Sequence, residues 1–139
     1  MVKGNNNQSI EDYLKSILVI KERQGYARSI DVARFLGVTN PSACVAMRKL
    51  KEQGYVTMDD SSHLFLTDEG KKLAEKVYGK HRLLRDVLVA IGVAERVAEE
   101  EACNIEHMIS DDTYHKIDEF YKEYSRNSRR VLDKKSARR

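Results

Sequence analysis

Apolar residues recur with helical spacing along most of this sequence, and they predict a mainly α-helical protein. Residues 9–24 carry one apolar stripe, with Ser9 placed to cap the helix and Asp12 three positions later, as in a capping box. Two shorter helices follow over 29–36 and 40–53, joined by a turn at Gly37. The apolar positions of the three predicted helices are Ile10, Tyr13, Leu14, Ile17, Leu18, Ile30, Val32, Ala33, Leu36, Ala43, Ala46, Met47 and Leu50.

The pattern then changes to two short runs of alternating residues, Tyr55–Met58 and Leu64–Thr67, with polar residues between them. Such a pair predicts a β-hairpin. Helix, tight turn, helix and hairpin, in this order, are typical of a winged helix-turn-helix, whose second helix enters the major groove of DNA. A plain three-helix packing unit with a solvated basic surface is the alternative interpretation.

Helical spacing returns in the second half of the chain. A long helix is predicted from Thr67, another over residues 94–109, and a third from Ser110. The third places four apolar or aromatic residues on one face, which we expect to form either a dimer interface or ordinary core: Tyr114, Ile117, Tyr121 and Tyr124. Periodicity is lost after Arg126, so residues 126–139 are predicted to be a basic, disordered tail.

Length and composition narrow the class of protein. A chain of 139 residues suits one domain or two small domains that share a core. No apolar run approaches the roughly 20 residues of a membrane span, and the N-terminus lacks the apolar segment of a signal peptide. We therefore expect a soluble, cytoplasmic protein with no membrane partner. The two cysteines, Cys44 and Cys103, are too few for a disulfide framework and are expected to be thiols.

Charge is distributed unevenly along the chain, although the net charge is only +3. Residues 28–53 hold five basic and two acidic residues, and residues 126–139 hold seven basic residues and one acidic residue. Residues 94–119 hold nine acidic and two basic residues. A basic segment suits a polyanion, and an acidic segment suits a cation.

The candidate DNA contacts lie on the exposed side of the predicted recognition helix, at its N-terminal end and just before it. Side chains at the start of such a helix reach base edges, while arginine and lysine neutralise phosphates. The acidic pair Asp59–Asp60 in the hairpin turn would repel phosphate unless it points away. The predicted contacts are Arg28, Thr39, Asn40, Pro41, Ser42, Cys44, Val45, Arg48 and Lys49.

Three residues with metal-binding side chains, Cys103, Glu106 and His107, are spaced at i, i+3 and i+4, and Glu99 falls on the same helix face. A thiolate, a carboxylate and an imidazole in this arrangement suit a first-row transition ion. The same residues also fit an ordinary helix surface, because free cysteine often behaves as a small hydrophobe. His81 lies on the apolar stripe of the long helix, where a core histidine is the alternative interpretation.

Several segments resemble the diphtheria toxin repressor and manganese transport regulator family. They occur in the family's order over residues 9–110 and read SIEDYLKSIL, GYARSIDVARFLGVTNPSACVAMRKLKEQGYV, LTDEGKKLA, KHRLL and EEACNIEHMIS. The resemblance implies a winged helix-turn-helix DNA-binding domain over residues 1–70 and a helical metal-binding and dimerisation domain over residues 71–125. It also implies a homodimer that binds a double-stranded DNA operator when loaded with Fe(II) or Mn(II). In length, the chain resembles the two-domain manganese branch.

The resemblance also implies a set of metal ligands. Glu106, His107 and His81 match both branches of the family. Asp12 matches the manganese branch and Cys103 the iron branch, so the predicted site is a hybrid. Two further positions depart from the family, because Lys15 replaces a carboxylate of the manganese branch and Arg85 replaces a glutamate of the iron branch. These departures argue against a full second metal site.

The sequence therefore favours a metal-dependent transcriptional repressor that controls metal homeostasis. The alternative is a winged-helix regulator without a metal effector. A metalloenzyme or metal-storage protein fits less well, because no separate general base or nucleophile pair accompanies the ligands. We expect no enzymatic activity.

Overall fold

The computed structural model describes residues 6–137 and divides the chain between Tyr78 and Gly79 into two compact units. The division falls inside helix α4, so each unit contains one part of that helix. Each unit is described below by itself. No helix among residues 6–137 is long and apolar enough to cross a membrane.

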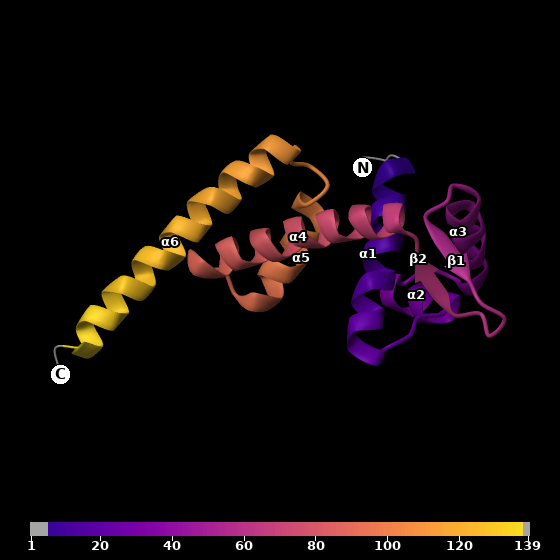
Figure 1. The fold of residues 1–139 in the computed structure, drawn as a ribbon, viewed down its shortest axis with the longest axis horizontal. Helices are drawn as coiled ribbons and strands as arrows, with labels where there is room; N and C mark the ends of the chain where they lie inside the picture. Colours follow the sequence, from indigo (N-terminus) through magenta and orange to yellow (C-terminus); the bar gives the residue numbers. More distant parts are fainter. Residues whose placement is uncertain (1–5, 138–139) are drawn as a thin grey trace. The chain divides into compact units, whose positions relative to one another are not determined.

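The first unit contains three helices, a two-stranded hairpin and the beginning of a fourth helix (Figure 1). Its core gathers apolar side chains from α1, α2, α3, the hairpin and α4, with Leu14, Ile17, Val32 and Leu64 fully buried. The elements are α1 (Asn6–Gln24), α2 (Ser29–Leu36), α3 (Asn40–Glu52), β1 (Val56–Met58), β2 (Leu64–Leu66) and α4 (Asp68–Ala90).

Helix α1 begins earlier than predicted. It starts at Asn6, so Ser9 lies inside the helix and is not its cap. Asp12 therefore lies in the second turn, and the capping box that would have explained it does not form there. The sequence suggested otherwise because a serine before an apolar stripe is a common helix start, whereas the polar residues ahead of it can also continue a helix.

The turn between α2 and α3 follows the prediction. Gly37 adopts a left-handed conformation, with φ 71° and ψ 30°, and its N–H donates to the carbonyl of Ala33. Thr39 caps α3, because its Oγ1 accepts a hydrogen bond from the N–H of Ser42 at 3.2 Å. Ile30 is 48% exposed, although its place in the apolar pattern predicts that it faces inward, because the short helix α2 is covered on the side of Val32 and Ala33.

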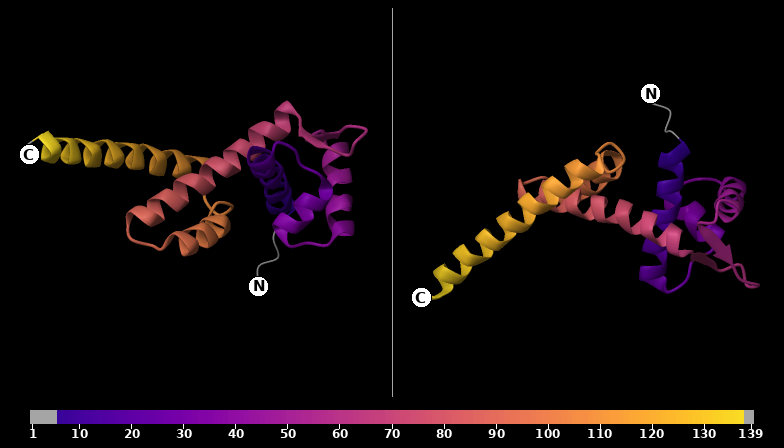
Figure 2. Two further views of the ribbon diagram at one scale, coloured as in Figure 1. Left: turned by 90° about the horizontal axis from the view of Figure 1, so that it is seen from below. Right: turned by 45° about the horizontal axis from the view of Figure 1, so that its top comes forward.

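The hairpin is a short wing next to α3 (Figures 1 and 2). Its strands are antiparallel and pair Val56 with Leu66 and Met58 with Leu64. Asp59 folds back over the turn, because its Oδ1 accepts the N–H groups of Ser61 and His63, each at 2.9 Å. These hydrogen bonds hold the pKa of Asp59 below its usual value.

The hairpin is attached to α4 by Thr67 and Gly70. The Thr67 hydroxyl donates to the carbonyl of Gly54 at 2.6 Å and accepts the N–H of Gly70 at 3.1 Å, which caps the helix. Gly70 is buried directly against the backbone carbonyl of Tyr55. Only a residue without Cβ fits at this point.

The second unit consists of the rest of α4, α5 (Glu95–Ile105) and α6 (Asp111–Ala137). Lys80 of α4 is buried, and its Nζ lies 3.2 Å from both the carbonyl of Ile109 and a carboxylate oxygen of Asp111. This lysine therefore fastens α4 to the turn between α5 and α6.

Both C-terminal helices differ in length from the prediction. Helix α5 ends at Ile105, so Glu106 and His107 lie in the turn that follows instead of inside a helix that reaches residue 109. Helix α6 runs through Ala137, past the point where apolar periodicity ends. The segment after Arg126 contains no glycine or proline. It is rich in residues of high helix propensity, including arginine, lysine, leucine and alanine, so it can continue the helix even though the apolar stripe has ended.

The packing of Gly70 can be tested by Gly70→Ala. The added methyl group would meet the Tyr55 backbone, so we expect a loss of about 1–3 kcal/mol in the free energy of unfolding, measured with urea and circular dichroism. Gly79→Ala is the matched control within the same helix, because its methyl group would meet only the movable hydroxyl end of Tyr114 at 2.9 Å. Equal stability of the two variants would contradict the described packing.

Candidate metal centre and nucleic-acid surface

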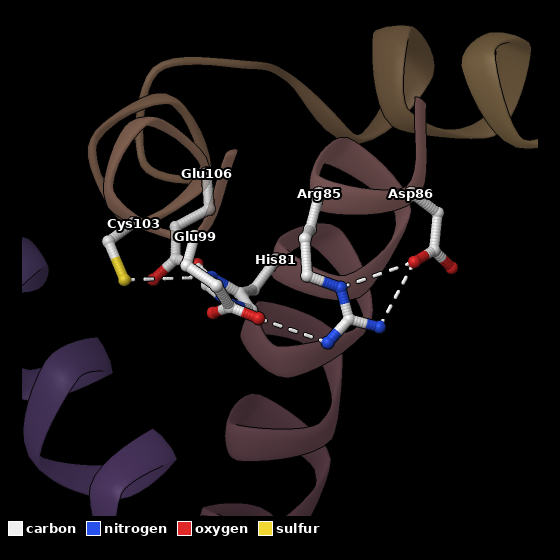
Figure 3. Close-up of polar contacts among 6 residues, drawn as sticks. All are labelled: His81, Arg85, Asp86, Glu99, Cys103 and Glu106. Carbon is white, nitrogen blue, oxygen red and sulfur yellow. Dashed lines mark hydrogen bonds and ion pairs between the residues drawn. The ribbon is translucent and has the colours of Figure 1, made fainter. Parts of the chain in front are cut away.

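The His81 imidazole lies at the centre of a polar cluster in the second unit (Figure 3). Its Nδ1 is 2.9 Å from Glu106 Oε2 and 3.6 Å from Cys103 Sγ. Its Nε2 is 2.8 Å from Glu99 Oε2. His81 and Glu106 are buried, with 6% and 1% of their surface exposed. Three potential metal donors thus meet on the Nδ1 side of one ring.

Helical spacing brings these side chains together. Glu99 and Cys103 are four residues apart on α5, and Glu106 follows three residues later at its C-terminal cap, so all three project toward α4. His81 and Arg85 are four residues apart on α4 and meet them from the other helix.

Glu106 also connects His81 to a second histidine. Its Oε1 lies 3.3 Å from Nε2 of His107, while its Oε2 contacts His81. The His107 side chain is 5% exposed. Four of the five predicted ligands, His81, Cys103, Glu106 and His107, therefore lie together within the second unit.

Arg85 and Glu99 form an ion pair beside this cluster, which the sequence did not predict as a pair. Arg85 Nη1 is 3.0 Å from Glu99 Oε1, and its Nε and Nη2 lie 3.2 and 3.0 Å from Asp86 Oδ1. Burial works to raise the pKa of Glu99, but the hydrogen bonds from Arg85 and His81 outweigh it and lower that pKa. In the sequence, the only sign of this arrangement was that His81 and Arg85, like Glu99 and Cys103, are four residues apart.

The environment of His81 favours its protonated form. Hydrogen bonds to Cys103, Glu106 and Glu99 together outweigh the opposing effect of burial and raise the pKa of His81 to about 10. At neutral pH the ring therefore carries a positive charge among acidic and thiol partners. This imidazolium supplies the charge balance that a buried carboxylate such as Glu106 requires.

The donor set fits a divalent transition metal ion. One nitrogen of His81, the sulfur of Cys103 and one oxygen of Glu106 all lie within 4.8 Å of one another. Sulfur, nitrogen and oxygen donors of this kind suit Fe(II), Co(II) and Zn(II), and the carboxylate also suits Mn(II). Asp12, the fifth predicted ligand, belongs to the first unit.

All nine residues that were predicted to contact DNA are exposed: Arg28, Thr39, Asn40, Pro41, Ser42, Cys44, Val45, Arg48 and Lys49. Seven of them lie on α3, and Arg28 and Thr39 are the caps of α2 and α3. Arg28 Nη2 lies 3.3 Å from Nε2 of His63 in the wing, and His63 contacts Asp59 at 3.2 Å. Asp59, the acidic residue directly after β1, is thus bound by His63 of the wing itself.

Two family models match almost the whole chain. Residues 7–64 match the N-terminal DNA-binding domain of iron-dependent repressors, and residues 67–130 match the metal-binding and dimerisation domain of the same repressors. The boundary between the two matches lies at the start of α4.

Individual proteins show the same similarity. An uncharacterized HTH-type transcriptional regulator of Methanocaldococcus jannaschii is 36% identical over 121 residues, which is 85% of this chain and 96% of that protein. The HTH-type transcriptional regulator MntR of Shouchella clausii is 33% identical over 125 residues, which is 90% of this chain and 87% of that protein. A solved manganese-dependent transcriptional repressor in complex with manganese is 35% identical, with a TM-score of 0.71. That match covers 78% of this chain and 50% of the solved chain, so this chain spans about half its length.

The charge on His81 predicts how the stability of the metal-free protein depends on pH. Because the pKa of His81 is raised from 6.5 to about 10, its protonated form stabilises the fold fully below pH 6.5, and this contribution is lost as the pH rises through 10. In chelator, the melting temperature should fall between pH 7 and pH 10, and less steeply in His81→Gln. Identical slopes in the two proteins would contradict the assigned environment.

Proposed function

This chain belongs to the iron-dependent repressor family, and from that premise we propose how its own residues bind metal and DNA. The chain is a metal-dependent, DNA-binding transcriptional repressor of metal homeostasis, and its metal is divalent, iron or manganese. The family consists of repressors and not of enzymes. The resemblance noted from the sequence and the mainly helical fold class with its winged helix-turn-helix are thereby confirmed.

The proposed DNA-reading element is α3 with the wing beside it. Its N-terminal half offers Asn40, Ser42 and Val45 to base edges in the major groove, while Arg48 and Lys49 neutralise phosphates. Arg28, held beside the wing by His63, adds a third cation on the same unit. The partner is a double-stranded operator, and the protein binds it as a homodimer with two recognition helices.

The proposed metal ligands are His81, Cys103, Glu106 and His107 of the second unit, together with Asp12 of the first. The contacts among the first four residues support this set, whereas Asp12 is assigned from the resemblance of its sequence position. When bound, the metal ion supplies a divalent charge that replaces the positive charge of His81 among the acidic groups. Coordination requires His81 as the neutral imidazole and Cys103 as the thiolate, so metal binding releases protons.

The thiol of Cys103 sets the metal preference in this proposal. A thiolate is a soft ligand, and it favours Fe(II), Co(II) and Zn(II) over Mn(II). Asp12 is a hard oxygen ligand and acts in the opposite direction. Because the thiolate binds as a charged soft donor, we expect its effect to prevail.

The proposed link between metal and DNA is Asp12. It lies on α1, five and eight residues before the buried Ile17 and Ile20, which belong to the core shared with the helix-turn-helix. Ligation by Asp12 would connect this helix to the ligands on α4 and α5, so that one ion restrains the unit that carries α3. Such a restraint would favour the dimer geometry that fits two successive half-sites of the operator.

The proposed dimer surface lies on the second unit. Large apolar side chains are exposed on this unit in the turn after α4, in the turn after α5 and on α6: Ile91, Met108, Phe120 and Tyr124. Tyr124 also stacks on Tyr121, with ring centroids 6.3 Å apart. Phe120 and Tyr124 are four residues apart on α6, so they lie on one face of that helix and could form an apolar patch that a partner covers.

The observation that carries the proposal is the meeting of His81, Cys103 and Glu106 on one side of a buried ring. It is tested by fluorescence anisotropy with operator DNA, measured anaerobically with Fe(II), Mn(II) or chelator. Metal should strengthen DNA binding, and Asp12→Ala should abolish this activation while the second unit still binds metal. Equal affinity in metal and in chelator would refute the metal-dependent mechanism.

Arg48→Ala provides the complementary control. It removes a proposed phosphate contact, so it should weaken DNA binding and lower its salt dependence without changing metal affinity. If Arg48→Ala also weakened metal binding, or if Asp12→Ala left metal activation unchanged, the two roles would be assigned incorrectly.

A further inference from the structure

Both oxygens of the Glu99 carboxylate form contacts beside the candidate metal ligands His81, Cys103 and Glu106. Oε2 lies 2.8 Å from Nε2 of His81, and Oε1 lies 3.0 Å from Nη1 of Arg85 (Figure 3). The arginine in turn is bound through Nε and Nη2 to Asp86. Arg85 is about one-third exposed. The series of contacts from Asp86 through Arg85 and Glu99 to His81 therefore runs from the surface to the buried ring.

The two nitrogens of His81 face different environments. On the Nδ1 side are the thiol of Cys103 and the carboxylate of Glu106, both of which can bind a metal ion. On the Nε2 side is Glu99, which already holds the guanidinium of Arg85. A divalent ion at Nε2 would have to displace the Glu99 oxygen from His81, and the other oxygen of that carboxylate is already held by Arg85.

We infer that Glu99 and Arg85 are a positioning pair that fixes the His81 ring for coordination through Nδ1, while Glu99 remains outside the coordination sphere. The inference rests on the proposed metal-binding function and deepens it. Histidine ligands commonly donate their second N–H to a carboxylate, which fixes the tautomer and the ring orientation and increases the basicity of the ligand. Here Glu99 is that carboxylate.

Arg85 has a separate part in this arrangement. It binds the oxygen of Glu99 that His81 does not use, and this keeps the carboxylate from turning away or joining the metal. Its own charge is balanced by Glu99 and Asp86, so it adds little net repulsion to a metal ion on the Nδ1 side. Arg85 therefore acts through Glu99 and does not touch the metal.

The nitrogen that binds the metal can be identified by NMR. The full-length protein is labelled with ¹⁵N-histidine, loaded with Zn(II) and recorded with and without chelator, and the His81 signals are assigned with His81→Gln. We expect Nδ1 to show metal coordination and Nε2 to retain its proton. Coordination through Nε2 would overturn the inference.

Variants of the pair test the positioning role. Glu99→Gln and Arg85→Met should each lower Zn(II) affinity, measured by competition with a chelating indicator, by about tenfold or more. The Zn(II) affinity of the double variant should be no lower than that of the single variant with the lower affinity, because both residues act through the same ring. Arg85→Lys, which keeps the charge but loses the forked contact to Asp86, should be intermediate.

The matched control is the exposed pair Arg96 and Glu100 on α5, which are 3.4 Å apart. Arg96→Met and Glu100→Gln should leave Zn(II) affinity unchanged, and melting curves in chelator show whether any variant has lost its fold. Cys103→Ser serves as a ligand variant, because it should remove the thiolate-to-Co(II) absorption band that Glu99→Gln retains.

The outcomes separate this inference from the proposed function. If the wild type binds neither Zn(II) nor Co(II), the proposed function fails, and the inference fails with it. If the wild type binds metal but Glu99→Gln and Arg85→Met bind equally well, only the inference fails. Loss of the Co(II) band in Glu99→Gln at saturating Co(II), as in Cys103→Ser, would show that the thiolate does not bind without Glu99 and would also overturn the positioning role.

Discussion

The polar cluster that joins α4 to α5 in the second unit depends on the His81 imidazole, which α4 places against Glu99, Cys103 and Glu106. Glu106 is almost completely buried, and a buried carboxylate is tolerated only when a hydrogen bond or an opposite charge compensates for lost water. The protonated ring supplies that charge to Glu106 on one side and to Glu99 on the other. A metal ion has to take over the same role, so the groups that stabilise the metal-free fold are also the groups that bind the metal.

The first unit is stabilised in a different way. Its core is apolar, and the geometry that presents α3 depends on the left-handed Gly37 and the Thr39 cap, while the wing is shaped by Asp59 and its turn. In our proposal, DNA reading therefore rests on this apolar scaffold, and the metal acts through Asp12 on where the scaffold is held.

The order of the elements and most of their bounds followed from the sequence, because apolar spacing and turn residues are local properties. Helix ends were less well predicted: α1 begins before Ser9, and α5 ends before Glu106, since polar residues can either continue or end a helix. The site was predicted in part. The spacing of Cys103, Glu106 and His107 suggested a metal face, whereas the ion pair of Arg85 with Glu99 joins residues 14 positions apart and depends on how α4 packs on α5.

The central claim, that Cys103 joins His81 and Glu106 around one metal ion, is tested most directly by X-ray absorption spectroscopy of the Zn(II)-loaded protein. The account predicts a sulfur neighbour at about 2.3 Å together with nitrogen and oxygen neighbours at about 2.0–2.2 Å. The sulfur neighbour should disappear in Cys103→Ser and persist in Cys44→Ser. A wild-type spectrum with nitrogen and oxygen neighbours alone would contradict the account.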